Sequence, residues 1–346
     1  MARTLTRWLP AAAVPLVIAG SVALASAAGA DELPERTPEE ILTLLADREH
    51  QPFSGEFEQS SDLGLPSLPG GVDLPAGEGD AAAVTAALDA LTSDHSGRVF
   101  VGEEHQARLQ VFESFGERDL IVNGTEVWAY DSSENAATHT TIPEGAHAAA
   151  PDQQQLTPDA VADRIIEAAG PTTDLSVRDD VEVAGRAAYD LVLTPRTDAT
   201  LVGEVAIAVD GETGQPLRVT VTARGEDAPA FQLAYTSLDL GAPDADLFTF
   251  TPPADAEVEE VTPPTGDHGS EPTDKPQPTV IGEGWESVAV LEAGDIASEP
   301  LLAQLTTAVD GGRLLSTDLV NALITDDGRV LVGAVPLERL QAAAAE

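Results

Sequence analysis

Two runs of short segments in which apolar and polar residues alternate occupy the middle of this chain of 346 residues. The first run extends over Gly97–Ile142 and the second over Thr173–Leu240. Side chains of a strand point alternately to its two faces, so this alternation predicts strands with one buried face. Tight-turn signals such as Asn123-Gly124 separate the segments, as in an antiparallel meander. The chain is therefore predicted to fold around a large antiparallel sheet.

In the second run, the alternation places apolar and polar residues on opposite faces of that sheet. Val205, Ile207 and Val209 fall on one face, whereas Glu204 and, in the next segment, Arg218 fall on the other. An apolar face opposite a polar face is typical of antiparallel sheets that cover a core on one side only. We expect this part of the sheet to be half exposed.

Three segments around these runs have the signals of helices. Thr37 precedes a proline and is followed three residues later by Glu40, a combination that predicts a capped helix start. Thr157 also precedes a proline, and its helix is expected to end at Gly170. A further helix is expected over Ala81–Leu91, where apolar residues recur with helical spacing.

The N-terminus has the order of residues found in secretory signals. Arg3 and Arg7 precede an apolar run, Leu9–Ala30, that ends in Ala-Gly-Ala before the first acidic residue. Two prolines within the run and its small-residue ending favour cleavage, so residues 1–30 are interpreted as a signal peptide. The alternative is an uncleaved N-terminal membrane anchor, because the run approaches the roughly 20 residues that span a bilayer. Both interpretations predict an extracytoplasmic protein.

The charge balance excludes several classes of partner and chemistry. The sequence holds 60 Asp and Glu against 17 Lys and Arg, a formal net charge of −43, so nucleic acid and anionic membrane surfaces would repel it. It contains no cysteine, which excludes a disulfide framework, a thiolate nucleophile and a lipid-modified N-terminal cysteine. No nucleic-acid partner is expected.

A polar, proline-rich segment divides the chain. Residues 31–260 are expected to form the main domain, 261–280 a Pro-rich acidic linker and 281–346 a C-terminal αβ extension. The extension is expected to contain a strand, a helix near Leu301–Ala308, a hairpin with a two-residue turn at Asp327-Gly328 and a final helix. Its strands are too apolar to remain in water, so we expect the extension to dock on the main sheet.

No motif in the sequence assembles an active site. Nucleophile-elbow, phosphate-loop and dinucleotide-binding patterns are missing. His105 stands beside Glu103 and Glu104, but a histidine between acids in a short turn is more often solvated than bound to a metal. With 60 acidic residues, a pair of carboxylates at glycosidase spacing is expected by chance. We expect no enzymatic activity, no cofactor and no metal, and we nominate no catalytic residue.

Aromatic and aliphatic residues on the predicted strands raise a question that alternation alone leaves open. Phe53 and Phe57 share one face of the strand that follows the first helix. This face either packs in an ordinary core or lines a cavity between a curved sheet and its helices. The candidates for lining such a cavity are Phe53, Phe57, Leu109, Val111, Trp128, Phe231, Leu233 and Tyr235.

Five segments, in their order along the chain, resemble a known superfamily: FSGEFEQSSDLGLP, RDLIVNGTEVWAYD, VAGRAAYDLVLTP, AVDGETGQPLRVTV and LFTFTPPADAEV. They are similar to the extracytoplasmic lipoprotein carriers of the LolA type and to the related RseB/MucB-type regulators of envelope stress, in the actinobacterial version. The resemblance extends over about Thr37–Val261. It implies an α+β fold, with a strongly curved antiparallel β-sheet (an incomplete barrel), helices plugging its concave face and an apolar cavity for acyl chains. The small C-terminal αβ extension, docked on this domain, is an addition to the carrier pattern.

The resemblance implies a non-enzymatic carrier or binding protein for lipid or lipoprotein acyl chains. The alternative is an RseB-like envelope-stress sensor or regulator that binds a membrane protein partner. The expected partner is therefore a lipid or an acylated lipoprotein and, in the second case, a membrane protein. An enzyme is the third hypothesis, for which the sequence offers no acid to nominate.

Overall fold

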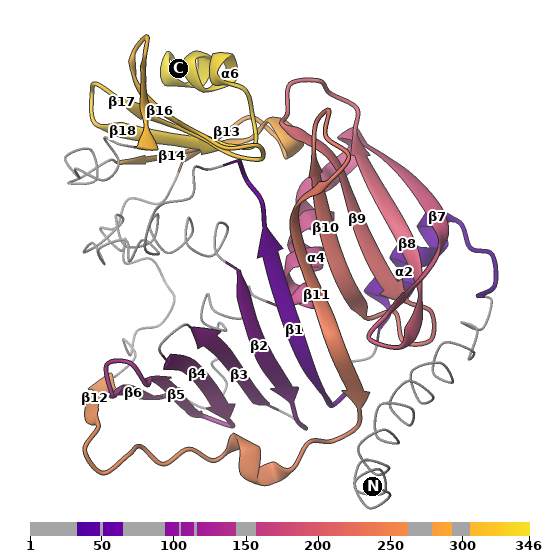
Figure 1. Ribbon diagram of the computed structural model, residues 1–346, viewed down its shortest axis with the longest axis vertical. Helices are drawn as coiled ribbons and strands as arrows, with labels where there is room; N and C mark the ends of the chain where they lie inside the picture. Colours follow the sequence, from indigo (N-terminus) through magenta and orange to yellow (C-terminus); the bar gives the residue numbers. More distant parts are fainter. Residues whose placement is uncertain are drawn as a thin grey trace, which may run out of the picture.

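The computed structural model describes residues 33–48, 51–64, 94–103, 105–113, 116–142, 157–261, 279–292 and 305–346. These residues form two β-sheets, one of twelve strands and one of six, together with short helices (Figure 1). The expected leader and the helix expected over Ala81–Leu91 lie outside the described residues, as does most of the expected linker.

The large sheet combines strands from both alternating runs. In chain order its strands are β1 (Phe53–Ser61), β2 (His95–Val101), β3 (Gln106–Glu113), β4 (Gly116–Asn123), β5 (Glu126–Asp131), β6 (Ala136–Thr141), β7 (Thr173–Val183), β8 (Arg186–Pro195), β9 (Val202–Asp210), β10 (Pro216–Ala223), β11 (Pro229–Leu240) and β12 (Glu257–Val261). Across the sheet the order is β12-β6-β5-β4-β3-β2-β1-β11-β10-β9-β8-β7. The sheet is curved and does not close into a barrel (Figure 1). Its strands are antiparallel, as predicted, except that β12 pairs with β6 in parallel.

Strands β1 and β11, which are far apart in the sequence, join the two runs into one sheet. Phe57 lies opposite Tyr235 in this antiparallel pair, and Ser61 lies opposite Phe231. A register shift between Glu56 and Phe57 marks a bulge, which bends the strand and increases its twist. We call the face of the large sheet that carries Phe57 the inner face, and the opposite face the outer face.

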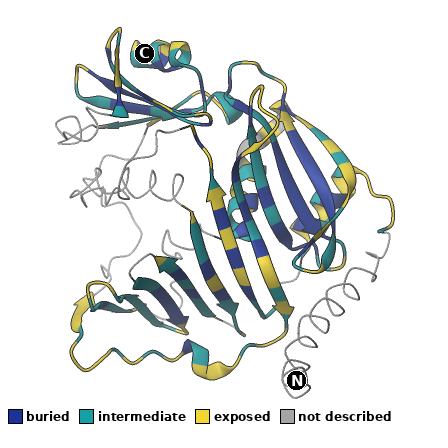
Figure 2. Cartoon of the chain, in the orientation of Figure 1, coloured by how far each residue is buried: buried dark blue, intermediate teal, exposed yellow. Residues whose placement is uncertain are grey.

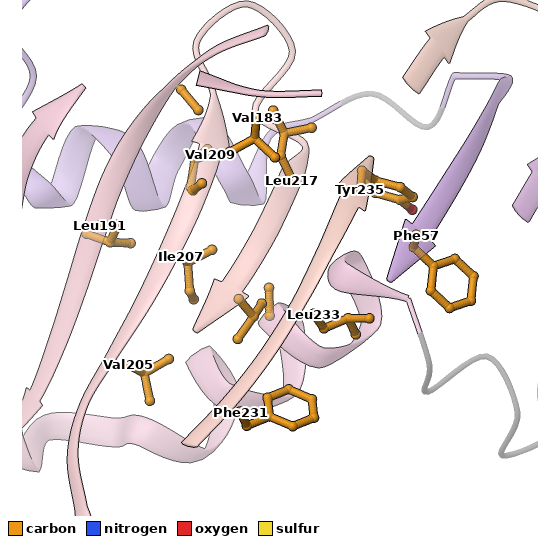
Figure 3. Packing of buried hydrophobic residues seen from close by; sticks show 14 of the residues in the cluster. Phe57, Val183, Leu191, Val205, Ile207, Val209, Leu217, Phe231, Leu233 and Tyr235 are labelled. Atoms are coloured by element: carbon orange, nitrogen blue, oxygen red, sulfur yellow. The ribbon is translucent and has the colours of Figure 1, made fainter. Parts of the chain in front are cut away.

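The main hydrophobic core lies on the inner face. Figure 3 shows Phe57 on β1 beside Tyr235 on β11, with Leu233 and Phe231 further along β11. Ile207 on β9 belongs to the same core and is wholly buried. The strand alternation predicted for the second run therefore does place its apolar residues together.

Helices α2 (Pro38–Ala46) and α4 (Pro158–Ala169) cover the inner face of β7–β11 (Figure 1). Thr37 and Thr157 cap their N-termini as predicted, and the predicted capping box of α2 is present. A 3₁₀ turn, η2 (Gly170–Thr172), follows α4 where its end was expected. Buried side chains of both helices belong to the main core, so these helices gain their stability from the sheet as well as from their caps.

Strands β8 and β9 are buried on both faces, which corrects the expectation of a half-exposed sheet (Figure 2). Ala206 and Ala208 on the outer face of β9 are as inaccessible as the residues that face the core. Asp190, which lies opposite Ala208, accepts a hydrogen bond of 2.9 Å from Arg178, and Arg178 also pairs with Glu204. Small side chains near long arginine stems can be buried even on a polar face. Strand β10 does have a partly exposed outer face, as predicted.

The small sheet is formed by the C-terminal extension. Its strands are β13 (Thr279–Ile281), β14 (Val288–Glu292), β15 (Thr307–Val309), β16 (Gly312–Ser316), β17 (Asn321–Thr325) and β18 (Arg329–Gly333), in the order β13-β14-β18-β17-β16-β15. Helix α6 (Leu337–Ala344) packs on β17 and β18. Together they enclose a second core that includes Val288, Leu331 and Leu340.

Two local predictions about the extension are wrong. Residues 307 and 308, expected at the end of a helix, belong to β15, because this strand pairs with β16 in an antiparallel hairpin; residues 301–304 lie outside the described parts. The other hairpin has a three-residue loop and not a two-residue turn. In this loop Gly328 has a φ of 89° and donates its N–H to the carbonyl of Thr325 at 3.1 Å. This combination is typical of a type I turn followed by a glycine bulge.

The extension buries most of its apolar strands in its own sheet and under α6, but it also docks on the large-sheet domain, as expected. Leu319 belongs to the main core, and Trp285 and Ala334 pack against that core. Hydrogen bonds add to this apolar contact. The hydroxyl of Thr200 and the N–H of Leu201 both donate to the carbonyl of Ala334, at 2.7 and 2.8 Å. Trp285, in the 3₁₀ turn η4 (Gly284–Glu286), donates its indole N–H to Thr173 at 2.8 Å.

Replacing Phe57 with alanine should destabilise the fold by about 3–5 kcal/mol, because the ring fills the core beside β11 and leaves a cavity when removed. Phe57 is 1% exposed, and the space above Gly97 is filled by its ring. Urea denaturation measures the free energy of unfolding.

The control is Phe100→Ala, which removes the same ring from a half-buried position on the outer face of β2. We expect this variant to lose much less stability. Equal losses for the two variants would contradict the assignment of the inner face as the core.

Candidate functional site

A cavity of about 380 Å³ lies on the inner face, between strands β1–β4 and helix α4. Ligand pockets in proteins have volumes of about 300–1,000 Å³, so this cavity is large enough to hold a small molecule or part of a larger one. Residues from five regions of the chain line it: Arg48, Gln51, Phe53, Val99, Val101, Ala107, Arg108, Leu109, Leu120, Val122, Thr157, Asp159, Ala160, Asp163, Thr213 and Gln215.

One wall of the cavity is apolar because it is the inner face of the first meander. Val99, Leu109 and Leu120 lie side by side across β2, β3 and β4. A second row on the same three strands is formed by Val101, Ala107 and Val122. Strand alternation sends the polar neighbours of these residues to the outer face, so the wall presents aliphatic side chains to the cavity.

The opposite end of the cavity is polar. Asp159, in the first turn of α4, accepts a hydrogen bond of 2.7 Å from the hydroxyl of Tyr235. Arg48 lies just after α2 and pairs with Asp163, with 2.5 Å between Nη2 and Oδ2. Gln215 enters from the turn between β9 and β10. The cavity is thus amphipathic, with an aliphatic wall at one end and hydrogen-bonding groups at the other.

Burial changes the protonation of Asp159 and Tyr235. Asp159 keeps some exposed area because it faces the cavity. Burial nevertheless raises its pKa to about 6, although the hydrogen bond from Tyr235 and the charge of Arg48 act to lower it. Burial, followed by the nearby Asp159 carboxylate, raises the pKa of Tyr235 well above 10. Tyr235 is therefore the hydrogen-bond donor of the pair, and Asp159 changes its charge in mildly acidic solution.

The turn between β9 and β10 holds Gln215 at the cavity. Asp210 accepts a hydrogen bond of 2.7 Å from the N–H of Thr213 and pairs with Arg186. Burial acts to raise the pKa of Asp210, but its hydrogen bonds to Arg186 and Thr213 outweigh burial and lower it. Gly214 has a φ of 76°, and a Cβ there would lie 2.3 Å from a backbone oxygen of α2. Glycine is therefore required for this turn to approach the helix.

Seven of the eight residues predicted to line a cavity lie on the inner face. Phe53 and Leu109 border the cavity directly. Val111 is the next inner-face residue of β3 and is buried. The other four pack in the main core: Phe57, Phe231, Leu233 and Tyr235. Strand β1 therefore contributes to the cavity through Phe53 and to the core through Phe57. Contact of any of these residues with a ligand stays a prediction.

Trp128 lies on the outer face, so it does not share a surface with the other seven candidates. It lies opposite Ile121, stacks on His139 with 4.1 Å between ring centroids, and packs against Phe250. The segment after β11, which contains the 3₁₀ turn η3 (Ala245–Phe248), crosses to this face and supplies the apolar cover (Figure 1). A second apolar layer of this kind cannot be recognised from alternation within one strand.

His139 connects the edge strand β12 to the sheet on the same outer face. Its Nε2 lies 2.5 Å from Glu126 on β5, and its Nδ1 lies 2.9 Å from Glu260 on β12. Burial acts to lower the pKa of His139, but the two carboxylates outweigh burial and raise it. The imidazolium form therefore links the parallel strand β12 to its neighbours.

Several cavity residues were missed by the sequence reasoning. Val99 and Leu120 stand at inner positions of their strands and could have been found by extending the alternation argument to aliphatic residues. Asp159, Arg48 and Gln215 had no such signal, because they come from a helix, a helix end and a turn that meet only in the folded chain.

Metal-binding clusters and membrane-spanning helices are two further features that could indicate a function. In the part of the chain that the structure describes, no group of three or more His, Asp or Glu side chains is placed to hold a metal ion. His105 occupies an exposed turn with a φ of 62°. None of the described helices has the length and apolar character needed to cross a bilayer.

Comparison with known proteins gives structural neighbours but no sequence family. No protein-family model matches the sequence, and no curated protein matches it significantly. MucB in the MucA/MucB complex of Pseudomonas aeruginosa is similar with a TM-score of 0.43 and 19% identity, over 89% of this chain and 96% of that chain. A LolA superfamily protein from Nitrosomonas europaea is similar with a TM-score of 0.25 and 11% identity, over 62% of this chain and 99% of that chain. The names MucB and LolA are also those of the proteins that the sequence segments resemble; the actinobacterial type stays a prediction.

Replacing Asp159 with asparagine should remove a pH dependence of stability. The pKa of Asp159 in the folded protein, about 6, lies above its usual value of 3.8. Protonated Asp159 therefore contributes to the free energy of unfolding. This contribution is complete below about pH 4 and is lost as the pH rises through about 6. The stability of the wild-type protein relative to Asp159→Asn should fall by about 1–3 kcal/mol between pH 4 and pH 7. Urea denaturation at both pH values measures this difference.

Glu167→Gln provides the control, since it removes an exposed carboxylate from the same helix and should show no such fall. A stability difference between wild type and Asp159→Asn that stays constant from pH 4 to pH 7 would contradict the assignment.

Proposed function

We propose that this protein is a non-enzymatic, exported carrier or binding protein that holds lipid or lipoprotein acyl chains in the cavity between β1–β4 and α4. The observation that supports this function is the amphipathic cavity, with its two aliphatic rows facing a polar end. An acyl chain has the same division into a long apolar part and a polar head.

Burial alone can supply the affinity for such a ligand. Each methylene group that leaves water for an apolar site stabilises the complex by about 0.8 kcal/mol. The aliphatic rows offer an alkyl chain no polar side chain that would have to be desolvated. Lipid binding here therefore requires no covalent chemistry, and the polar end serves to orient the ligand.

Filling the cavity should weaken lipid binding without unfolding the protein. Ala107 lies in the second aliphatic row between Val101 and Val122, so Ala107→Trp places an indole where the alkyl chain would lie. We expect affinity for a fluorescent fatty-acyl probe to fall about tenfold or more, equivalent to about two methylene groups left unburied. Fluorescence titration of the purified protein measures this change.

The matched control is Gln110→Trp, which adds the same ring to the outer face of the same strand. It should bind the probe like the wild type. In addition, native mass spectrometry of wild-type protein purified without detergent should detect bound lipid. Failure to find lipid, together with absence of probe binding, would refute the carrier function.

The second candidate is an RseB-like sensor or regulator that binds a membrane protein partner. The feature that favours it is the edge of the small sheet, where β13 pairs on one side only, with β14. Val280 on this strand is 61% exposed. An exposed edge strand with an apolar side chain is a surface on which a partner chain can add a strand.

Photo-crosslinking distinguishes the regulator from the carrier. A photoreactive residue at Val280 should crosslink a membrane protein in cells of the host if the edge of β13 is a partner site. The same residue at Val258, which is also exposed but lies on β12 of the large sheet, is the control. Crosslinks from neither position, or equally from both, would speak against the regulator.

A further inference from the structure

The side-chain amide of Gln215 is a buried hydrogen-bond donor that faces the cavity. Gln215 is 6% exposed and borders the cavity at its polar end. Its amide interacts with the nearby Tyr235 hydroxyl and acts to lower the pKa of that tyrosine. Within the described residues, however, no acceptor lies at full hydrogen-bond geometry to the Nε2 of Gln215, which carries two N–H groups. Nearly all buried polar side chains in proteins are hydrogen-bonded, because an unsatisfied buried donor is costly. An unsatisfied donor at the end of a cavity is therefore suited to accept a ligand oxygen as its partner.

The charges around Gln215 indicate which kind of oxygen fits. Arg48, Asp159 and Asp163 are the charged side chains of the helices at this end. Arg48 is already paired with Asp163 and with a backbone carbonyl of α2. The remaining lining cation, Arg108, pairs with Asp119 on the outer face. No free positive charge of the described lining residues is left to bind a carboxylate.

The neighbouring carboxylates also act against an anionic ligand. Above a pH of about 6, Asp159 is ionised, so the cavity end carries one positive and two negative charges. A ligand carboxylate placed beside Gln215 would be repelled, whereas a neutral carbonyl oxygen accepts the amide N–H without adding charge.

We propose that Gln215 recognises the neutral carbonyl of an acyl ester or acyl amide whose alkyl chain lies along the aliphatic wall. This inference rests on the proposed acyl-chain function and deepens it, because it specifies the head of the ligand. The site selects chains that are esterified or amidated, as in intact lipids and acylated proteins, over free fatty acids. Gln215 is a specificity residue in this proposal, and it performs no chemistry.

Competition between three ligands of equal chain length tests the proposal on the wild-type protein. Methyl laurate, dodecane and laurate compete at pH 8 with a neutral fluorescent probe, N-phenyl-1-naphthylamine. One hydrogen bond should make methyl laurate bind about two- to tenfold more tightly than dodecane. Ionised laurate should bind more weakly than methyl laurate. Equal affinities for methyl laurate and dodecane, or a preference for laurate, would overturn the inference.

A variant and a spectroscopic measurement identify the donor. Gln215→Met keeps a long unbranched side chain but has no N–H, so it should bind methyl laurate and dodecane equally well. The infrared carbonyl stretch of ¹³C-labelled methyl laurate should lie at lower frequency when bound to the wild type than when bound to this variant. Gln110→Met, on the outer face, is the control and should resemble the wild type. An unchanged carbonyl frequency in Gln215→Met would refute the role of Gln215.

Failure of this inference differs from failure of the carrier function. If the protein binds the probe and dodecane but does not prefer the ester, only the recognition by Gln215 is wrong. If it binds neither the probe nor any of the three ligands, the carrier function is wrong and the inference falls with it.

Discussion

The pairing of β1 with β11 is the interaction on which the rest of this structure depends. Each alternating run forms a meander by itself, but only this antiparallel pair joins them into one twelve-stranded sheet. The pair brings Phe57 opposite Tyr235, so that the apolar faces of both runs become one continuous inner face. Long-range pairs of this kind carry the cost of closing a large loop, which the buried aromatic contacts offset. Without the pair, the core and the cavity would have no common wall.

The cavity lies where the two halves of the sheet meet the helices, and its character follows from that position. The first meander contributes aliphatic rows to one wall, while α4 and the β9–β10 turn contribute Asp159 and Gln215 to the other end. Tyr235 connects the two parts, since its ring packs in the core and its hydroxyl binds Asp159. The core therefore holds the polar end in place. This arrangement leads to the proposed function, in which burial provides affinity and the polar end provides selectivity.

Much of the fold was predictable because its signals are local. Strand alternation gave the segments of both meanders, and Thr37 and Thr157 marked the helix starts. The site was less predictable. Of the candidates that alternation offered, Phe53 and Leu109 border the cavity, whereas Trp128 lies on the outer face, because a strand's own pattern does not reveal which of two partly apolar faces is the inner one. A helix was expected to end at residue 308, but residues 307 and 308 form part of β15, because pairing with β16 outweighs their local preference.

The sequence by itself determined that this chain forms antiparallel strands with apolar faces, capped helices and a strongly acidic surface. These properties depend on residue type and on spacing over a few positions. Only the tertiary structure decided that β8 and β9 are buried on both faces, that the extension has its own core, and that Arg48, Asp159 and Gln215 meet at one end of a cavity. Those features require the register and packing of elements distant in sequence, and no local pattern encodes which distant residues will become neighbours.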